Sequence, residues 1–462
     1  MQALPPPCEE GSRVGVIATS GPVKGPQLRA GIAQLRSWGL VPVVYRGAAS
    51  TEAAERDSEG DEAAPFLAAA GADAGDVADG SGGAAVAALA SRDGTSSFLS
   101  ATDADRASEL SAALSDPSTT AVLCARGGYG AARLLPLLDW RVLGGAARRK
   151  RFVGFSDVSA IHAALRAGAS GADTQPPSDT AAGGGNSAAA ASSGGAGVSG
   201  GGLVTFHGPM VATGKFFTAL PPPDLKRLHA ALFAEALTAA AFPPLQGQAL
   251  YGAVGRGRER GVGVLVGGNL STLASLCGTG VELASDRPYI LVLEDHDETA
   301  QRIDRLCQQL RMAGLLDERP GQTEKAAGSG RGRLAGIVLG RFDKSDVLMP
   351  SGSLGPGRSG GGGGGGGGPL CCAKQVWGEE HTSQREIRRF AQYWENQDRE
   401  EPQAFFWRRV VELSKETPTI WRCGFGHGTE NATLPLGAVC AVEPTRAVLE
   451  LASPEEAAAL WA

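Results

Sequence analysis

Three polar residues far apart in the chain, Ser156, Glu294 and His427, are of the types needed for nucleophilic catalysis. A serine hydroxyl is a poor nucleophile at its free pKa and needs a base within hydrogen-bond reach. An imidazole can be that base when a carboxylate fixes its tautomer and stabilises its charged form. Nucleophile, acid and base occur here in the order seen in α/β-hydrolases, although triads arise in any order. We therefore interpret the three residues as a candidate Ser-Glu-His triad.

Ser156 follows a short apolar run, Phe152–Phe155, and precedes a helical apolar pattern that begins at Val158. This order predicts a strand-to-helix turn in which the hydroxyl points outward, as in a nucleophile elbow. Gly154 leaves room for a tight turn, whereas Val158 departs from the Gly-x-Ser-x-Gly form. An alternative interpretation is that Ser156 and Asp157 only cap the helix.

Glu294 and His427 also occupy positions that favour a defined geometry. Glu294 ends the apolar strand expected at Tyr289–Leu293, which would hold its carboxylate rigidly, although a solvated residue at a strand end is an alternative. His427 lies between two glycines, which allow close approach and unusual backbone angles. His296, two residues beyond Glu294, is the main rival base.

The first half of the chain alternates short apolar strands with amphipathic helices, which predicts a mostly parallel sheet covered by helices on both faces. The strands are expected at Arg13–Ala18, Leu40–Tyr45, Ala121–Ala125 and Phe152–Phe155. In such sheets the working groups collect at the carboxyl ends of strands. Ser156 and the glycine-rich turn Arg126–Gly130 both follow strand ends. That turn could cradle a phosphate in a nest of amides, but an oxyanion hole needs the same backbone chemistry.

The second half predicts further strands and helices. They are expected at Gly261–Thr279 (strand then helix), Tyr289–Leu293 (strand), Ile303–Leu315 (helix), Leu334–Leu339 (strand), Arg385–Lys415 (helix), Ala438–Val442 (strand) and Ala447–Leu451 (strand). We therefore divide the chain into an N-terminal α/β domain at 12–215 with the nucleophile, a connection at 216–250, and a C-terminal domain at 251–462 with Glu294 and His427.

Low-complexity segments interrupt both halves. Residues 47–98 and 167–202 are rich in small and polar residues, and an expanded region at about 344–416 contains the Gly-rich stretch 351–369. Such segments bury too little apolar surface to offset the entropy lost on ordering. We expect them to be disordered insertions in surface loops.

Composition excludes several function classes. A formal net charge of -6 over 462 residues gives no basic footprint for nucleic acid. The eight cysteines show no Cys-x-x-Cys pair and no metal-ligand spacing, so we expect a reducing compartment and no metal. Residues 1–11 lack the features of a targeting leader, and no apolar run could span a bilayer, which favours a cytoplasmic location. Gly261-x-Gly263-x-x-x-Gly267 is a loosened dinucleotide fingerprint that begins inside a strand, so no cofactor is expected.

Several motifs together resemble one family. They are Arg126-Gly-Gly-Tyr-Gly130 with Arg133-Leu-Leu-Pro-Leu-Leu-Asp-Trp140, Val153-Gly-Phe-Ser-Asp157, Thr205-Phe-His-Gly-Pro-Met210, Gly267-Gly-Asn-Leu270, Leu291-Val-Leu-Glu-Asp295, and Phe425-Gly-His-Gly428 with Leu434-Pro-Leu-Gly437. In this order they are similar to the L,D-carboxypeptidase family of serine peptidases, the murein tetrapeptide carboxypeptidases. The match covers most of the chain outside the insertions.

The resemblance implies a flavodoxin-like N-terminal parallel-sheet domain, a C-terminal β/α/β domain, an active site between them and a homodimer. It implies that Ser156, Glu294 and His427 form the triad and that the amides of Asp157 and Gly128 form the oxyanion hole. We assign substrate binding to Gly127, Tyr129 and Asn269, which lie within the matching motifs.

The implied reaction is hydrolysis of the L,D-amide bond that releases terminal D-alanine from murein tetrapeptides. A related subgroup cleaves a peptide–nucleotide antibiotic of the microcin C type, which is one alternative. Another is a catalytically silent protein that binds muropeptides. The insertions at 167–202 and 344–416 fall outside the catalytic motifs, so we expect them to affect specificity rather than chemistry.

Overall fold

The computed structural model describes residues 4–45, 66–67, 98–171, 202–214, 220–249, 259–281, 283, 287–316, 332–343 and 417–461. The three expected insertions lie outside the described residues, except for 66–67, which form a short strand within the first, and 98, 167–171 and 202 at the ends; 167–171 continue a helix. The helix expected at Arg385–Lys415 also lies outside them. Among the described helices, none has both the length and the apolar character needed to cross a bilayer.

The first sheet is parallel except at one edge. Its strand order is β13-β6-β5-β4-β1-β2-β3. The strands are β1 (Arg13–Ile17), β2 (Val41–Tyr45), β3 (Phe66–Leu67), β4 (Thr119–Cys124), β5 (Arg151–Gly154), β6 (Thr205–His207) and β13 (Leu434–Leu436). β13 pairs antiparallel with β6, and all other pairs are parallel. Without the two-residue β3, the order β2-β1-β4-β5-β6 is the flavodoxin-like order. The predicted fold class is confirmed.

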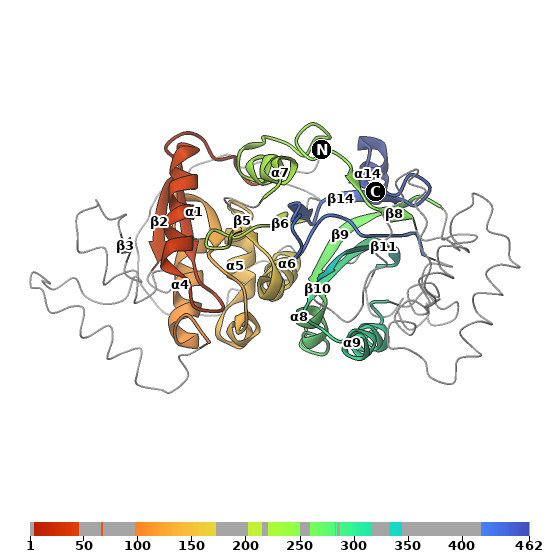
Figure 1. Cartoon of the computed structure of the whole chain (residues 1–462), viewed down its shortest axis with the longest axis horizontal. Coiled ribbons are helices and arrows are strands. Elements are labelled where there is room, and N and C mark those ends of the chain that lie inside the picture. The colour runs from red at the N-terminus through yellow and green to blue at the C-terminus, as the bar shows by residue number, and fades with distance from the viewer. Residues whose placement is uncertain are drawn as a thin grey trace, which may run out of the picture.

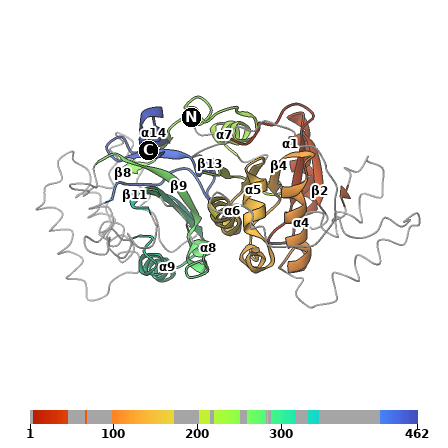
Figure 2. The same ribbon diagram turned by 180° about the vertical axis from the view of Figure 1, so that it is seen from behind.

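Helices cover both faces of this sheet because its strands are apolar on both sides. α1 (Gly25–Ser37) and α7 (Pro222–Phe233) share one core with Val14, Val16 and Val153. α4 (Asp103–Ser115), α5 (Trp140–Ala147) and α6 (Ser159–Gly171) pack on the other face, in a core with Ile17 and Phe152. Figures 1 and 2 show the two layers of helices and place α6 beside the second sheet.

The apolar residues Leu134, Leu135 and Leu138 favour a single helix after the glycine-rich turn, but the structure interrupts it. The segment forms a 3₁₀ helix, η2 (Ala131–Leu137), and α5 begins only at Trp140, with Asp139 as its cap. Pro136 lies inside η2. Because proline has no N–H and disfavours the α conformation of the preceding residue, a continuous α-helix cannot form there.

The second sheet is mixed, with the order β7-β15-β14-β9-β10-β11-β12-β8. The strands are β7 (Leu245–Gln246), β8 (Gln248–Ala249), β9 (Gly261–Asn269), β10 (Tyr289–His296), β11 (Leu334–Asp343), β12 (Thr419–Trp421), β14 (Val439–Glu443) and β15 (Val448–Leu451). β9 to β12 are parallel, and α8 (Leu270–Ser275) and α9 (Ala300–Met312) follow β9 and β10.

One segment near the C-terminal end joins the two sheets. β13 pairs with β6 of the first sheet, and β14, three residues later, pairs with β9 of the second. Gly437 lies at the crossing with φ of 96°, and a Cβ there would lie 2.0 Å from the carbonyl oxygen of Leu203. Only glycine fits such a position.

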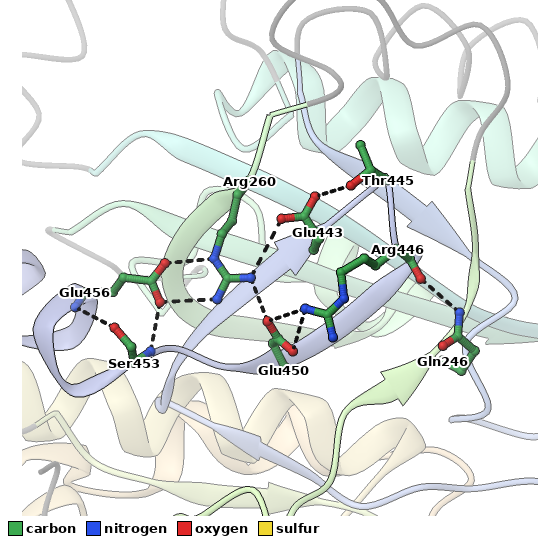
Figure 3. A network of polar contacts seen from close by, with 8 residues as sticks. All are labelled: Gln246, Arg260, Glu443, Thr445, Arg446, Glu450, Ser453 and Glu456. Carbon is green, nitrogen blue, oxygen red and sulfur yellow. Dashed lines mark hydrogen bonds and ion pairs between the residues drawn. The ribbon is translucent and has the colours of Figure 1, made fainter.

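An ion-pair network fixes the last helix, α14 (Pro454–Trp461), to the edge of the second sheet (Figure 3). Arg260 Nε lies 2.7 Å from Glu456 Oε1, and its Nη1 lies 2.6 Å from Glu450 Oε1. The bond with Glu456 is the largest cause of the raised pKa of Arg260. Since these side chains are partly exposed, the network contributes about 1 kcal/mol or less per pair.

Candidate active site

Ser156 lies on a strained turn between β5 and α6. Its φ is 63°, in the left-handed region, and Ser156–Val158 form a single 3₁₀ turn before the helix. A Cβ on Gly154 would lie 2.7 Å from Val158 Cγ1, which explains the need for glycine two residues before the serine. Non-glycine residues held in this region cost about 1–3 kcal/mol and cluster at functional sites.

His427 joins Ser156 to Glu294. Its Nε2 lies 2.9 Å from Ser156 Oγ, and its Nδ1 lies 2.6 Å from Glu294 Oε2. Burial alone would raise the pKa of the fully buried Glu294, but interactions with His427, His207 and Asn269 hold that pKa below its ordinary value. An ionised carboxylate at this position can fix the tautomer in which Nδ1 donates and Nε2 accepts. The arrangement can therefore remove a proton from the serine hydroxyl.

Two rings hold the imidazole of His427 in place. His296, the rival base, stacks on it with ring centroids 4.9 Å apart and an interplanar angle of 14°. Phe155 also contacts the ring, at 5.0 Å and 53°. Both nitrogens of His427 are engaged with Ser156 and Glu294, so His427 and not His296 is the histidine that links those two residues.

Gly426 allows the His427 loop to approach Glu294. Its φ is 101°, and a Cβ there would lie 2.7 Å from Glu294 Oε2. We expect Gly426→Ala to displace the carboxylate and lower kcat by roughly 10²-fold, because an error of about 1 Å in positioning has that effect. The measurement is steady-state peptide hydrolysis by purified protein.

Gly314→Ala is the matched control for this prediction. Gly314 also has a left-handed φ, 77°, but a Cβ there meets nothing within 4 Å. We expect it to lower stability by about 1 kcal/mol through backbone strain and to leave kcat unchanged. Equal losses of kcat in the two variants would contradict a role for the contact between Gly426 and Glu294.

The glycine-rich turn after β4 lies against the nucleophile. A Cβ on Gly127 would lie 3.1 Å from Ser156 Cβ, and Gly128 has φ of 120°. The Asp157 carboxylate accepts a hydrogen bond of 2.8 Å from the Ala131 amide, so it ties this turn to the serine turn. Burial raises the pKa of Asp157. This contact of the Asp157 carboxylate was not predicted, because no spacing rule indicates it.

The remaining predicted binding residues have different surroundings. Tyr129 is 56% exposed and lies beside Phe98, 54% exposed, with ring centroids 6.1 Å apart. Asn269 is buried, accepts a hydrogen bond from the Thr272 amide at the start of α8, and donates one of 3.0 Å to Asp295 Oδ1. Tyr129 is thus open to a ligand, whereas the Asn269 side chain is engaged within the protein. Their roles in binding stay predictions.

The geometry argues against the dinucleotide alternative. Gly261, Gly263 and Gly267 all lie within β9, where a Cβ would meet the backbone of neighbouring chain segments at 2.0–2.7 Å. A dinucleotide fingerprint places its glycines at the turn that opens the following helix. Within the described part of the chain, no group of three or more His, Cys, Asp or Glu could hold a metal ion.

Profiles of two domains match the chain. The LD-carboxypeptidase N-terminal domain matches residues 73–173, and the LD-carboxypeptidase C-terminal domain matches residues 262–322. A provisionally named carboxypeptidase of Streptomyces coelicolor is 34% identical over 311 residues, which are 66% of this chain and 72% of that protein. The chain belongs to the LD-carboxypeptidase family. As a member it is a serine-type carboxypeptidase, so the resemblance seen in the sequence is confirmed.

Other members and structures are more distant. The murein tetrapeptide carboxypeptidase of Pseudomonas aeruginosa is 34% identical over 215 residues, 46% of this chain and 57% of that protein. The chain therefore spans little more than half of this relative. A solved structure of MccF in complex with glutamyl sulfamoyl guanosine matches with a TM-score of 0.55 at 16% identity, over 98% of each chain. At 16% identity this match shows only that the LD-carboxypeptidase and MccF share a fold.

Proposed function

We propose that this LD-carboxypeptidase hydrolyses the L,D-amide bond that releases terminal D-alanine from murein tetrapeptides. The observation that supports this most is the continuous contact from Glu294 through His427 to Ser156, at 2.6 and 2.9 Å. The name of the Pseudomonas relative supports the choice of substrate. The domain limits 12–215, 216–250 and 251–462, a homodimer and a cytoplasmic location remain part of the proposal.

The proposed mechanism uses the contacts of the triad and the amides of the two neighbouring turns. His427 Nε2 accepts the proton of Ser156 while Oγ attacks the carbonyl carbon of the L-centre, and Glu294 stabilises the imidazolium. The amides of Asp157 and Gly128 hold the oxyanion, each donor contributing about 3 kcal/mol in comparable sites. His427 then protonates the leaving D-alanine nitrogen as the amide bond breaks. Water, deprotonated by His427, attacks the acyl-enzyme. As the ester bond breaks, His427 returns that proton to Ser156 Oγ and the shortened peptide leaves.

A second candidate is a peptide–nucleotide amidase of the microcin C type. The shared fold with MccF, solved with glutamyl sulfamoyl guanosine, favours it. The exposed Phe98 and Tyr129 beside the glycine turn add an aromatic surface on which a base could stack. A silent muropeptide-binding protein fits the site less well, because binding alone requires no hydrogen-bonded serine, histidine and carboxylate.

One experiment separates these candidates. Purified protein is incubated with a murein tetrapeptide and, separately, with a peptide–nucleotide conjugate, and products are identified by mass spectrometry. We expect D-alanine only from the tetrapeptide and covalent labelling of Ser156 by a serine-directed probe. Cleavage of the conjugate alone would select the amidase, and absence of both cleavage and labelling would select the silent protein.

A further inference from the structure

A second buried histidine lies behind the proposed triad. His207, the last residue of β6, has 0% exposure, and both of its ring nitrogens lack a hydrogen-bond partner among the described residues. Its ring packs edge-on against Phe155 at 5.9 Å and Phe425 at 6.4 Å, the two aromatic residues that flank the His427 loop and the serine turn. Burial lowers the pKa of His207 to about 4, so the ring is neutral and offers one N–H donor and one acceptor.

Glu294 presents an unused oxygen in the same region. Its Oε2 contacts His427, whereas its Oε1 is buried and accepts no hydrogen bond of standard geometry from the described residues, although the Asn269 side chain lies near enough to help lower the pKa of Glu294. Glu294 and His207 are close enough to interact electrostatically. Asn431 adds a third group, since its Oδ1 accepts the amide of Gly426, which packs on Glu294, while its Nδ2 is buried and unpartnered.

Such groups are rarely left unsatisfied in native proteins. A buried polar group without a partner costs about 1–3 kcal/mol, and more when it is charged. Buried water satisfies such groups when a site offers two to four polar partners. Glu294 Oε1 accepts, Asn431 Nδ2 donates, and His207 does either according to its tautomer. Together they offer the partners that one water requires.

We propose that a buried water bridges His207, Glu294 Oε1 and Asn431, and that His207 thereby acts as a positioning residue for the triad carboxylate. The inference rests on the proposed function, because it assigns a task to the proposed acid. The water donates to Oε1 and so holds the carboxylate in the orientation in which Oε2 meets His427 Nδ1. Charge-assisted bonds of this kind are about twice as strong as neutral ones.

Loss of this bridge has a specific electrostatic consequence. When His427 is neutral, the buried carboxylate bears an uncompensated charge and depends on its donors. When His427 is protonated, the ion pair compensates that charge. Removing a donor therefore destabilises the deprotonated pair more than the protonated one. Among the described residues, Asp295, in the same strand, and His296, stacked on His427, also face the pair, and His162 faces His207. A substitution at His207 leaves all three residues in place.

The test compares His207→Phe with a matched control, His162→Phe. His162 is equally buried and its ring lies 6.2 Å from that of His207, but both of its nitrogens are already bonded, to Thr205 and the Gly154 carbonyl. We expect His207→Phe to lower kcat about 10-fold with KM unchanged. We also expect it to move the midpoint of the acid limb of kcat/KM upward by about one pH unit. His162→Phe is expected to lower the Tm without moving that limb.

Two further measurements keep the inference testable if His207→Phe folds poorly. His207→Gln, which retains a donor and an acceptor, is expected to restore the acid limb. A crystal structure of the wild-type protein is expected to show an ordered water within hydrogen-bond distance of Glu294 Oε1 and His207. A wild-type limb in His207→Phe, or a dry contact between the two side chains, would overturn the inference. Full turnover by Ser156→Ala would instead overturn the proposed function, so the two failures are distinguishable.

Discussion

Ser156→Ala is expected to lower peptide hydrolysis by roughly 10⁴–10⁶-fold, the range lost when the nucleophile of a serine protease is removed. The reason is that Oγ forms the acyl bond and its hydroxyl donates to a single base, His427 Nε2, at 2.9 Å. Without the hydroxyl, no other described side chain contacts that nitrogen in its place. The measurement is D-alanine release by purified variant and wild-type protein under saturating tetrapeptide.

The fold of this variant is expected to survive. Alanine adopts the left-handed backbone of position 156, φ 63°, with the same strain as serine. Ser156→Gly removes that strain, so we expect equal loss of turnover and a Tm at least as high as that of Ser156→Ala. Rates near wild type in either variant would exclude the acyl-enzyme mechanism. A collapse of the Tm in both would show that the serine is structural.

The second large effect is loss of stability in mild acid. Burial lowers the pKa of His162 to about 3 and of His207 to about 4, from 6.5. Since the folded-state values lie below the unfolded value, the stabilisation is complete above about pH 6.5 and is lost as pH falls toward the folded values. At 1.36 kcal/mol per pKa unit, the lowered pKa of His207 alone corresponds to a loss of roughly 3 kcal/mol in the free energy of unfolding as pH falls through this range. We therefore expect the urea midpoint to fall steeply between about pH 6.5 and 4.5.

His162→Gln isolates one part of this effect. Burial raises the pKa of Asp157, Asp224 and Asp295, so these carboxyls favour the folded state as pH falls and oppose the histidines. These carboxyls are unchanged in the variant. Any difference from wild type in the slope of unfolding free energy against pH therefore comes from His162. We expect a smaller loss of unfolding free energy in the variant over the same interval. Equal slopes would contradict a buried neutral His162.

Much of the fold could be predicted because its strands are unambiguous apolar runs. β1, β2, β4, β5, β9, β10, β11, β14 and β15 begin and end within a few residues of the predicted limits. β13 was missed as a strand because three residues with a central proline show no alternation, and only pairing with β6 gives it a place. The end of η2 was not predicted, because the apolar pattern continues past Pro136 and hides the break that the proline causes.

The candidate site, like the fold, could be predicted from the sequence only in part. Ser156, Glu294 and His427 could be selected because each follows a strand end or lies beside glycine, and the structure brings them within hydrogen-bond distance. His207 also ends a strand and lies beside a glycine, Gly208, but it was not selected because a buried histidine is more often part of the core. Its importance depends on which groups surround it in space, and sequence spacing does not contain that information.

The crossing of the segment 424–443 between the two sheets has a consequence during synthesis. β6 acquires its outer neighbour, β13, only after residue 436 has left the ribosome, more than 200 residues after β6 itself. Until then the first sheet has an open edge beside the apolar Phe206. Unpaired edges of this kind recruit chaperones or aggregate. The proposed base emerges in the same late segment, so on the proposed mechanism the nascent protein cannot turn over substrate until this edge is about to close.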